Sequence, residues 1–166
     1  MAHVVARVRA TPGAALPLAA GASMKRYKLI LADTGLFQRI AGMREHEWKN
    51  ETALMNQYLG TVTEQVVGQE LLSLDDQDLD TGLFYWDRSE ARATAELDYL
   101  AAFNGKIVPI EVKSGASGHM KSMFRFLQEH PSYPLGIRLS EKNFGMREKV
   151  MNVPLYAIAC LPVLAG

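Results

Sequence analysis

Two strand-like segments on either side of Asn104-Gly105 constrain the fold of this chain more than any other feature. Residues 95–101 and 106–113 each carry enough apolar side chains to be half-buried or buried strands. An Asn-Gly pair favours a two-residue type I′ turn, because both of its residues tolerate a positive φ angle. The pair therefore predicts an antiparallel hairpin, and it fixes which residues of the two strands face each other.

The predicted hairpin brings two carboxylates together. Asp98 and Glu111 lie at equal separations of six residues from the turn. We therefore expect them to be cross-strand neighbours, pointing to the same side with Cβ atoms within about 5 Å. Because side chains alternate along a strand, Glu96 should share the face of Asp98, while Leu97 and Tyr99 should point the other way.

Two carboxylates at this distance repel each other unless a cation neutralises them. Hard oxygen ligands suit Mg²⁺ or Mn²⁺. Lys113 lies two residues after Glu111 and so shares its strand face. A lysine beside a bound metal can orient or deprotonate an attacking water and stabilise a charged phosphate. Asp98, Glu111 and Lys113 therefore predict a site for metal-assisted phosphodiester hydrolysis.

A fourth candidate, Glu64, lies on a long helix predicted over residues 51–74. On that helix Glu64 shares a face with Gly60, Val67 and Gly68. The two glycines would let this face approach a sheet closely. A carboxylate on such a face is costly unless it finds a cation or a donor, so we expect Glu64 to join the same metal site.

The remaining segments predict an α/β domain at residues 25–166, preceded by an extended arm at residues 1–24 that lies outside the core. The arm is rich in Ala, Gly and Pro and begins with a short strand-like piece. Polar residues around 143–145 predict a loop, and an apolar segment ends the chain. The predicted elements are strands at His3–Val8, Tyr27–Ala32, Leu83–Trp86 and Gly136–Leu139, a helix capped by Asp33 to about Ala41, a helix at His119–Glu129, and the apolar segment Leu155–Leu164.

Composition excludes several classes of protein. The 18 basic and 18 acidic residues cancel, so nucleic acid or an anionic membrane would have to be bound by a local patch. A single cysteine, Cys160, excludes an intramolecular disulfide and a cysteine-based zinc site, and its apolar neighbours predict a buried thiol. There is no membrane-length apolar run, and the alanine-rich N-terminus is a poor signal peptide, so we expect a cytoplasmic location. The sequence contains no G-x-x-x-x-G-K-[ST] loop.

Several strings together resemble a known family. They are YKLILADTGL (27–36), GTVTEQVVGQEL (60–71), LFYW (83–86), AELDYL (95–100) and IVPIEVKSG (107–115). The chain resembles, over about residues 15–160, the PD-(D/E)XK nuclease-like C-terminal domain of unknown function that follows the P-loop domain in many bacterial and archaeal AAA-type ATPases. Here no ATPase part is present, and the resemblance leaves open whether the chain is a stand-alone remnant or a fragment.

The resemblance implies a restriction-endonuclease-like fold with a mixed sheet flanked by helices. It also implies Glu64, Asp98 and Glu111 as ligands of Mg²⁺ or Mn²⁺, with Lys113 as the catalytic lysine. Leu97 stands where the name of the superfamily has proline. The ATPase-linked relatives have no settled nuclease activity, so the residues can persist without turnover.

Blander interpretations remain open. A second E-x-K string, Glu47-Trp48-Lys49, lies in a polar connector and carries no such meaning. Glu111 and Lys113 could form a salt bridge on a solvated strand face, and Asp98 and Glu64 could be surface acids. The acidic run Asp75–Asp80 lacks the EF-hand pattern and therefore predicts a solvated loop. His119, Lys121 and Arg125 could meet a phosphate at a helix N-terminus or be ordinary helix surface.

At the level of function, the alternative to a nuclease acting on DNA is a non-catalytic interaction or regulatory module that binds an ATPase domain or itself.

Overall fold

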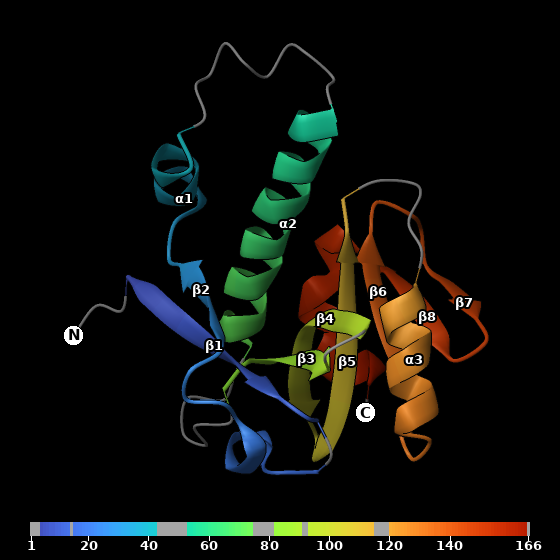
Figure 1. Ribbon diagram of the computed structural model, residues 1–166. Coiled ribbons are helices and arrows are strands. Elements are labelled where there is room, and N and C mark those ends of the chain that lie inside the picture. Colours follow the sequence, from blue (N-terminus) through green and yellow to red (C-terminus); the bar gives the residue numbers. More distant parts are fainter. Residues whose placement is uncertain are drawn as a thin grey trace.

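A mixed eight-stranded sheet forms the centre of the computed structural model, which describes residues 4–13, 15–42, 53–74, 82–90, 93–114 and 120–165. The strand order is β2-β1-β3-β4-β5-β6-β8-β7, and helices cover both faces (Figure 1). The α/β class with a mixed sheet flanked by helices is confirmed. In chain order the elements are β1 (Val5–Thr11), η1 (Leu18–Gly21), β2 (Tyr27–Leu31), α1 (Thr34–Ile40), α2 (Ala53–Ser73), β3 (Phe84–Glu90), β4 (Ala93–Phe103), β5 (Lys106–Lys113), α3 (Lys121–Glu129), β6 (Gly136–Ser140), β7 (Gly145–Arg147), β8 (Val150–Pro154), η3 (Leu155–Cys160) and α4 (Leu161–Leu164).

The β4–β5 hairpin forms as predicted. Asn104 and Gly105 both have positive φ angles, 50° and 73°, which is the backbone of a type I′ turn. The paired residues run from Phe103 opposite Lys106 to Tyr99 opposite Ile110. This is the predicted register, and its next step would set Asp98 opposite Glu111.

The predictions of helices α1 and α2 from local sequence patterns are also confirmed. The Asp33 carboxylate accepts a hydrogen bond from the backbone N–H of Leu36 at 2.7 Å, which caps the N-terminus of α1. The helix predicted over residues 51–74 is α2. Trp86 on β3 is 3% exposed, as expected of a core residue.

Strand β1 corrects the interpretation of residues 1–24 as an arm that contributes nothing to the core. It lies between β2 and β3, antiparallel to β2 and parallel to β3. Val8 and Ala10 on this strand are 0% and 2% exposed. The sequence predicts a strand at residues 3–8, but its place in the sheet depends on partners at residues 27–31 and 84–86, which the local composition does not reveal. The division of the chain at residue 24 stays a prediction.

The C-terminal part differs from expectation in two ways. The polar residues around 143–145 begin a β-hairpin, in which β7 pairs with β8 and Glu148 takes a positive φ of 54° in the turn. Cys160 is exposed, not buried. Its apolar neighbours Ile158 and Leu161 turn into the core, while the thiol faces outward.

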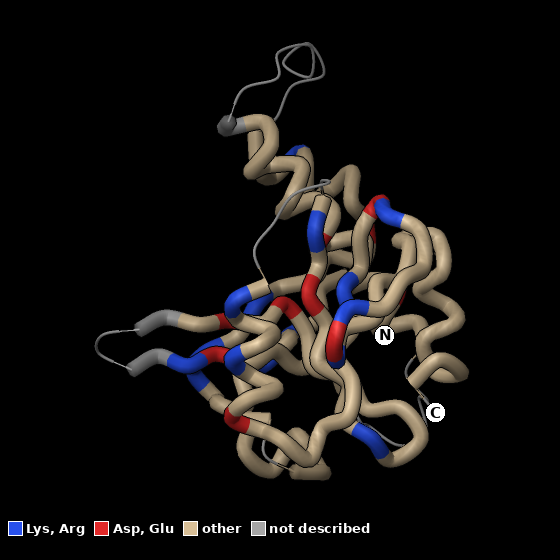
Figure 2. The backbone as a smooth tube through the Cα atoms, turned by 90° about the vertical axis from the view of Figure 1, so that its right-hand side faces the viewer, with Lys and Arg blue, Asp and Glu red and all other residues tan. Residues whose placement is uncertain are grey.

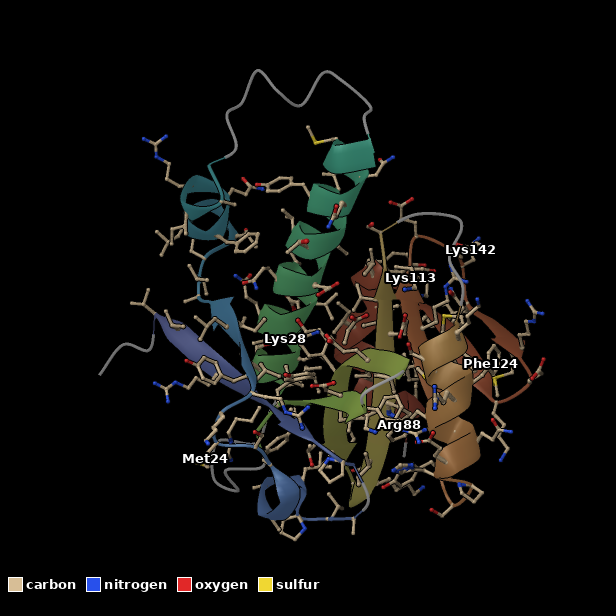
Figure 3. The ribbon with its side chains drawn as sticks, in the orientation of Figure 1. Met24, Lys28, Arg88, Lys113, Phe124 and Lys142 are labelled. Atoms are coloured by element: carbon tan, nitrogen blue, oxygen red, sulfur yellow. The ribbon has the colours of Figure 1, made fainter. Side chains whose placement is uncertain are left out.

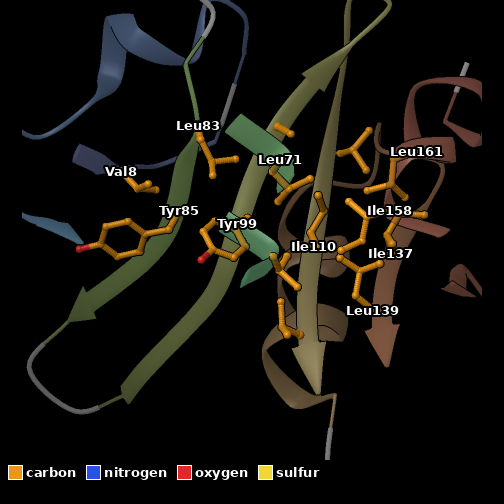
Figure 4. Packing of buried hydrophobic residues seen from close by; sticks show 14 of the residues in the cluster. Val8, Leu71, Leu83, Tyr85, Tyr99, Ile110, Ile137, Leu139, Ile158 and Leu161 are labelled. Atoms are coloured by element: carbon orange, nitrogen blue, oxygen red, sulfur yellow. The ribbon is translucent and has the colours of Figure 1, made fainter. Parts of the chain in front are cut away.

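The sheet separates two apolar clusters. One lies under α2, η3 and α4 and includes Tyr99, Ile110 and Leu71 (Figure 4). The other lies under α3 and η1 and includes Leu97, Leu100 and Phe126. Since each cluster buries one face of the sheet, the strand side chains are fixed from both sides.

Helix α2 is held to the sheet by its small residues and its amides. A Cβ atom on Gly68 would lie 2.7 Å from Ile30 Cδ1 and from Tyr99 Oη, so the glycine permits the close approach that the sequence predicted. The Gln65 side chain accepts from the N–H of Leu31 at 3.1 Å and donates to the carbonyl of Leu29 at 2.9 Å. These bonds satisfy the edge of β2 as a neighbouring strand would, and they fix the position of Glu64.

Some predictions fall on residues that the structure does not describe. These are the acidic run 75–80, the connector string 47–49 and His119. Within the described ranges, no helix is both long enough and apolar enough to cross a bilayer.

Candidate functional site

A bulge in β4 places Asp98. Opposite β3, the register shifts so that Phe84 pairs with Leu100 but Trp86 pairs with Leu97. One extra residue is therefore accommodated in β4 at this point, and Leu97 and Tyr99 enter different core clusters. This corrects the expectation that they share a face, because a bulge breaks simple alternation and re-aims the side chain it carries.

The bulge directs the Asp98 carboxylate towards β5. Its Oδ2 accepts a hydrogen bond from the backbone N–H of Val112 at 2.7 Å, and its side chain is only 16% exposed. Burial raises the pKa of Asp98, and the bond from Val112, together with Lys28 and Lys113, opposes that rise. Asp98 is thus bound to the backbone of the residue after Glu111, and the two acids do not form the simple cross-strand pair that the sequence predicted.

Glu111 and Lys113 form an ion pair next to Asp98. Glu111 is 6% exposed, and its Oε1 lies 2.6 Å from Lys113 Nζ. Its other oxygen, Oε2, is buried without a hydrogen-bond partner. Burial and then repulsion from Asp98 raise the pKa of Glu111 to about 7, against the attraction of Lys113. A solvated strand face would not leave a carboxylate in this state.

Glu64 approaches Asp98, Glu96 and the two lysines from α2. Burial and repulsion from Asp98 raise its pKa to about 7, while Lys28 and Lys113 lower it. The Glu64 carbonyl also accepts a hydrogen bond from Tyr99 Oη at 2.7 Å, which ties this turn of the helix to β4. The helical acid is therefore within electrostatic reach of Asp98 and Glu96, and its part in a metal site stays a prediction.

Lys28 is a member of the site that the sequence reasoning missed. It extends from β2 across the ring of Tyr85, with Nζ 5.0 Å from the ring centroid. It forms an ion pair with Glu96 and lies 4.0 Å from Asp98 Oδ1. Burial opposes its charge, but the hydrogen bond to Glu96 and the nearby acids outweigh this and raise its pKa. Glu96 itself is 48% exposed, in keeping with a solvated acid.

We call the six residues Lys28, Glu64, Glu96, Asp98, Glu111 and Lys113 the acid–lysine cluster. Lys28 and Lys113 lie apart from each other (Figure 3) and pair with different acids, and acidic and basic positions adjoin along the backbone (Figure 2). Four carboxylates against two ammonium groups leave two negative charges in excess when all are ionised. Among the described residues, no three Asp, Glu, His or Cys side chains are placed to hold a metal ion together.

The three residues proposed to meet phosphate at the start of α3 are not brought together. Lys121 is exposed and lines a cavity beside α3. Arg125 forms an ion pair with Glu129 one turn along the helix, at 3.1 Å. His119 lies outside the described residues.

The fold and the cluster define a mixed α/β domain with buried acids and lysines at the open end of a β-hairpin. The chain belongs to the family described as Domain of unknown function (DUF4143), whose profile matches residues 59–158. That match covers more than half of the chain and includes Glu64, Asp98, Glu111 and Lys113. No curated protein and no solved structure matches the chain.

Proposed function

We propose that this chain is a nuclease-like domain of the PD-(D/E)XK type, which binds nucleic acid and hydrolyses phosphodiester bonds with a divalent metal. The observation that carries the proposal is the buried, partnerless Oε2 of Glu111. It belongs to a carboxylate that is repelled by Asp98 and paired through its other oxygen with Lys113. An unpartnered anionic oxygen in a cluster with excess negative charge suits a cation.

The donor set fits Mg²⁺ or Mn²⁺. Mg²⁺ keeps several of its waters and is commonly held by only one or two protein carboxylates. Asp98 and Glu111 would hold the ion directly, and Glu64 would act through the waters around it. This arrangement does not need three converging side chains. When bound, such an ion polarises a phosphate oxygen and acidifies a bound water.

The residues of the chain have separate roles in this proposal. The bond from Val112 holds the Asp98 carboxylate in one orientation. The Lys113 ammonium, positioned by Glu111, would donate hydrogen bonds to a phosphate oxygen or to the attacking water. Lys28 is a positioning residue, because it pairs with Glu96 and lies beside Asp98, one of the acids that would hold the ion.

Metal binding is tested by thermal unfolding with and without Mg²⁺ or Mn²⁺. We expect either ion to raise the Tm of the wild type by several degrees and to leave the Tm of Asp98→Asn unchanged. Glu70→Gln on the exposed face of α2 removes one carboxylate elsewhere and should respond like the wild type. Equal responses of Asp98→Asn and the wild type would remove the metal site from the proposal.

Hydrolysis is tested on a plasmid and on a branched DNA substrate. We expect cleavage that requires the metal and is lost in Lys113→Ala. Lys106→Ala, at the opposite end of β5, is the matched control and should retain activity. Cleavage that survives in Lys113→Ala would contradict the assigned role of this lysine.

A second candidate function is a non-catalytic module that binds an ATPase domain or a second copy of itself. It is favoured by apolar side chains left exposed beside α2 and η3. Val66 and Tyr156 are 40% and 81% exposed and line a cavity of about 450 Å³. Metal binding by the wild type without cleavage of either DNA would favour this function over the nuclease.

A further inference from the structure

A second polar site lies on the other side of β5 from α2. It is a cavity of about 490 Å³ between α3 and the β6–β8 end of the sheet, which we call the basic groove. Phe124 on α3 and Lys142 just after β6 (both labelled in Figure 3) are among its lining residues. Its volume falls in the range of small-molecule and nucleotide pockets.

The basic groove is strongly cationic. Lys121, Arg138, Lys142 and Arg147 line it, and no Asp or Glu is among its described lining residues. The whole chain has equal numbers of basic and acidic residues, so this concentration is local. It is also the opposite of the acid–lysine cluster, where acids are in excess. Four cations without an acid predict an anionic occupant.

Arg138 is the most informative of the four cations. Its Nε and Nη2 atoms are buried and have no hydrogen-bond partner. Its neighbours Ile137 and Leu139 enter the core cluster on the opposite face, so the guanidinium is on the groove side. Buried donors of this kind are costly unless a partner binds them. The planar fork of a guanidinium matches the oxygens of a phosphate.

The loop that carries Lys142 is fixed before any ligand binds. Asn152 on β8 donates from its side-chain amide to the carbonyls of Lys142 and Asn143, at 2.9 and 2.8 Å. The same side chain accepts from Ser140 Oγ at 2.6 Å. Two bonds hold the loop and the third orients Asn152, so the backbone at Lys142 loses little entropy on binding.

The other walls of the groove are apolar. Met120 and Phe124 on α3 and Met146 on β7 line it with the cations. An aromatic ring and thioethers beside bound phosphate provide a surface on which a base can stack. A duplex hides the faces of its bases, so this combination suits a single strand.

We propose that the basic groove binds one nucleotide unit of a single-stranded nucleic acid, with its phosphate on Arg138 and Lys142 and its base against Phe124. The groove adjoins the acid–lysine cluster, because Arg138 on β6 pairs in register with Glu111 on β5. A strand leaving the groove would therefore reach Glu111 and Lys113. Only this last step rests on the proposed function, since binding in the groove needs no metal.

The test uses the full chain in EDTA and a fluorescently labelled oligothymidylate, with binding followed by anisotropy. We expect Arg138→Gln and Lys142→Ala each to weaken binding by about tenfold, as the loss of a phosphate contact should. Lys142 is exposed, so its variant should not disturb the fold. Lys106→Ala removes the same charge outside the groove and should bind within about twofold of the wild type.

The base is tested with an abasic oligonucleotide that has the same number of phosphates. We expect it to bind about tenfold more weakly than oligothymidylate to the wild type, and Phe124→Ala to remove this difference. Equal binding of the two oligonucleotides would show that the groove recognises charge alone and would overturn the proposal. Wild-type affinity in both Arg138→Gln and Lys142→Ala would also overturn it.

Two further arms separate the possible explanations. Thymidine monophosphate that displaces the oligonucleotide at a similar concentration would make the free nucleotide the occupant and overturn the assignment to a strand. If the groove variants lose binding but the wild type does not cleave DNA with any metal, the groove proposal stands and the proposed nuclease function fails. If cleavage requires a metal but Arg138→Gln and Lys142→Ala leave it unchanged, the nuclease function stands and the groove proposal fails.

Discussion

The carboxylate of Asp98 accepts a hydrogen bond at 2.7 Å from the backbone N–H of Val112, the residue after Glu111. Asp98 lies one residue before Tyr99, and Val112 lies two residues after Ile110; Tyr99 and Ile110 are the last paired residues of the hairpin. Beyond the last backbone pair of β4 and β5, a hydrogen bond to a side chain joins the two strands. It holds an acid beside Glu111 although the two strands have begun to separate.

This bond predicts a difference between two substitutions at Asp98. Asp98→Ala leaves the N–H of Val112 without its acceptor, whereas Asp98→Asn offers a carbonyl oxygen in the same place. Both variants lose the same charge. We expect Asp98→Asn to be more stable than Asp98→Ala by about 1–3 kcal/mol in urea unfolding with EDTA present. Equal free energies of unfolding would show that the bond contributes nothing.

The buried acids predict a pH dependence of the metal-free protein. Burial and the charge of Asp98 raise the pKa of Glu64 and of Glu111 to about 7. A carboxyl whose pKa is raised by folding holds its proton more tightly in the folded state. Its contribution to stability is therefore complete below its unfolded pKa and is lost as the pH rises through about 7.

We accordingly expect the Tm in EDTA to fall between about pH 5.5 and 8. Glu64→Gln should fall less steeply over the same range. The pKa of His130 is lowered by burial and gives an opposite trend, but it is present in both proteins and cancels in the comparison. Parallel pH profiles for the two proteins would contradict the prediction.

Lys28 predicts a competition between a lysine and a metal ion. Lys28→Met removes the cation that pairs with Glu96 and adjoins Asp98, so the metal-free protein should lose about 1–3 kcal/mol of stability. A divalent ion would then replace the missing charge, and the Tm rise with Mn²⁺ should exceed that of the wild type. Lys25→Met, on the exposed segment before β2, is the control. A smaller Mn²⁺ response in Lys28→Met would contradict this role.

The two glycines of α2 predict opposite effects of alanine. A Cβ atom on Gly68 would lie 2.7 Å from Ile30 Cδ1, so Gly68→Ala should cost about 1–3 kcal/mol by overpacking. A Cβ atom on Gly60 would meet only Ser114 Oγ, at 3.5 Å. Gly60→Ala should therefore gain up to about 1 kcal/mol from helix propensity. Urea unfolding measures both, and a stabilised Gly68→Ala would disprove the close contact.

Features that depend on residues close together in the chain could be predicted from the sequence alone. Asn104-Gly105 specifies its turn through the φ angles that these two residues accept, and the turn fixes the β4–β5 register. Asp33 caps α1 through a residue three positions away. The same local logic brought Glu64, Asp98, Glu111 and Lys113 forward as candidates. Asp98 and Lys113 lie within electrostatic reach of both glutamates.

Features that depend on residues far apart in the chain became apparent only in the folded protein. The position of β1 between β2 and β3, the bulge that turns Asp98 towards β5, and the approach of Lys28 to the acids arise from pairings across many residues. The basic groove likewise joins α3 to the β7–β8 hairpin. Such contacts form because the whole sheet and its helices must bury both apolar faces at once, and no short segment of the chain carries that requirement.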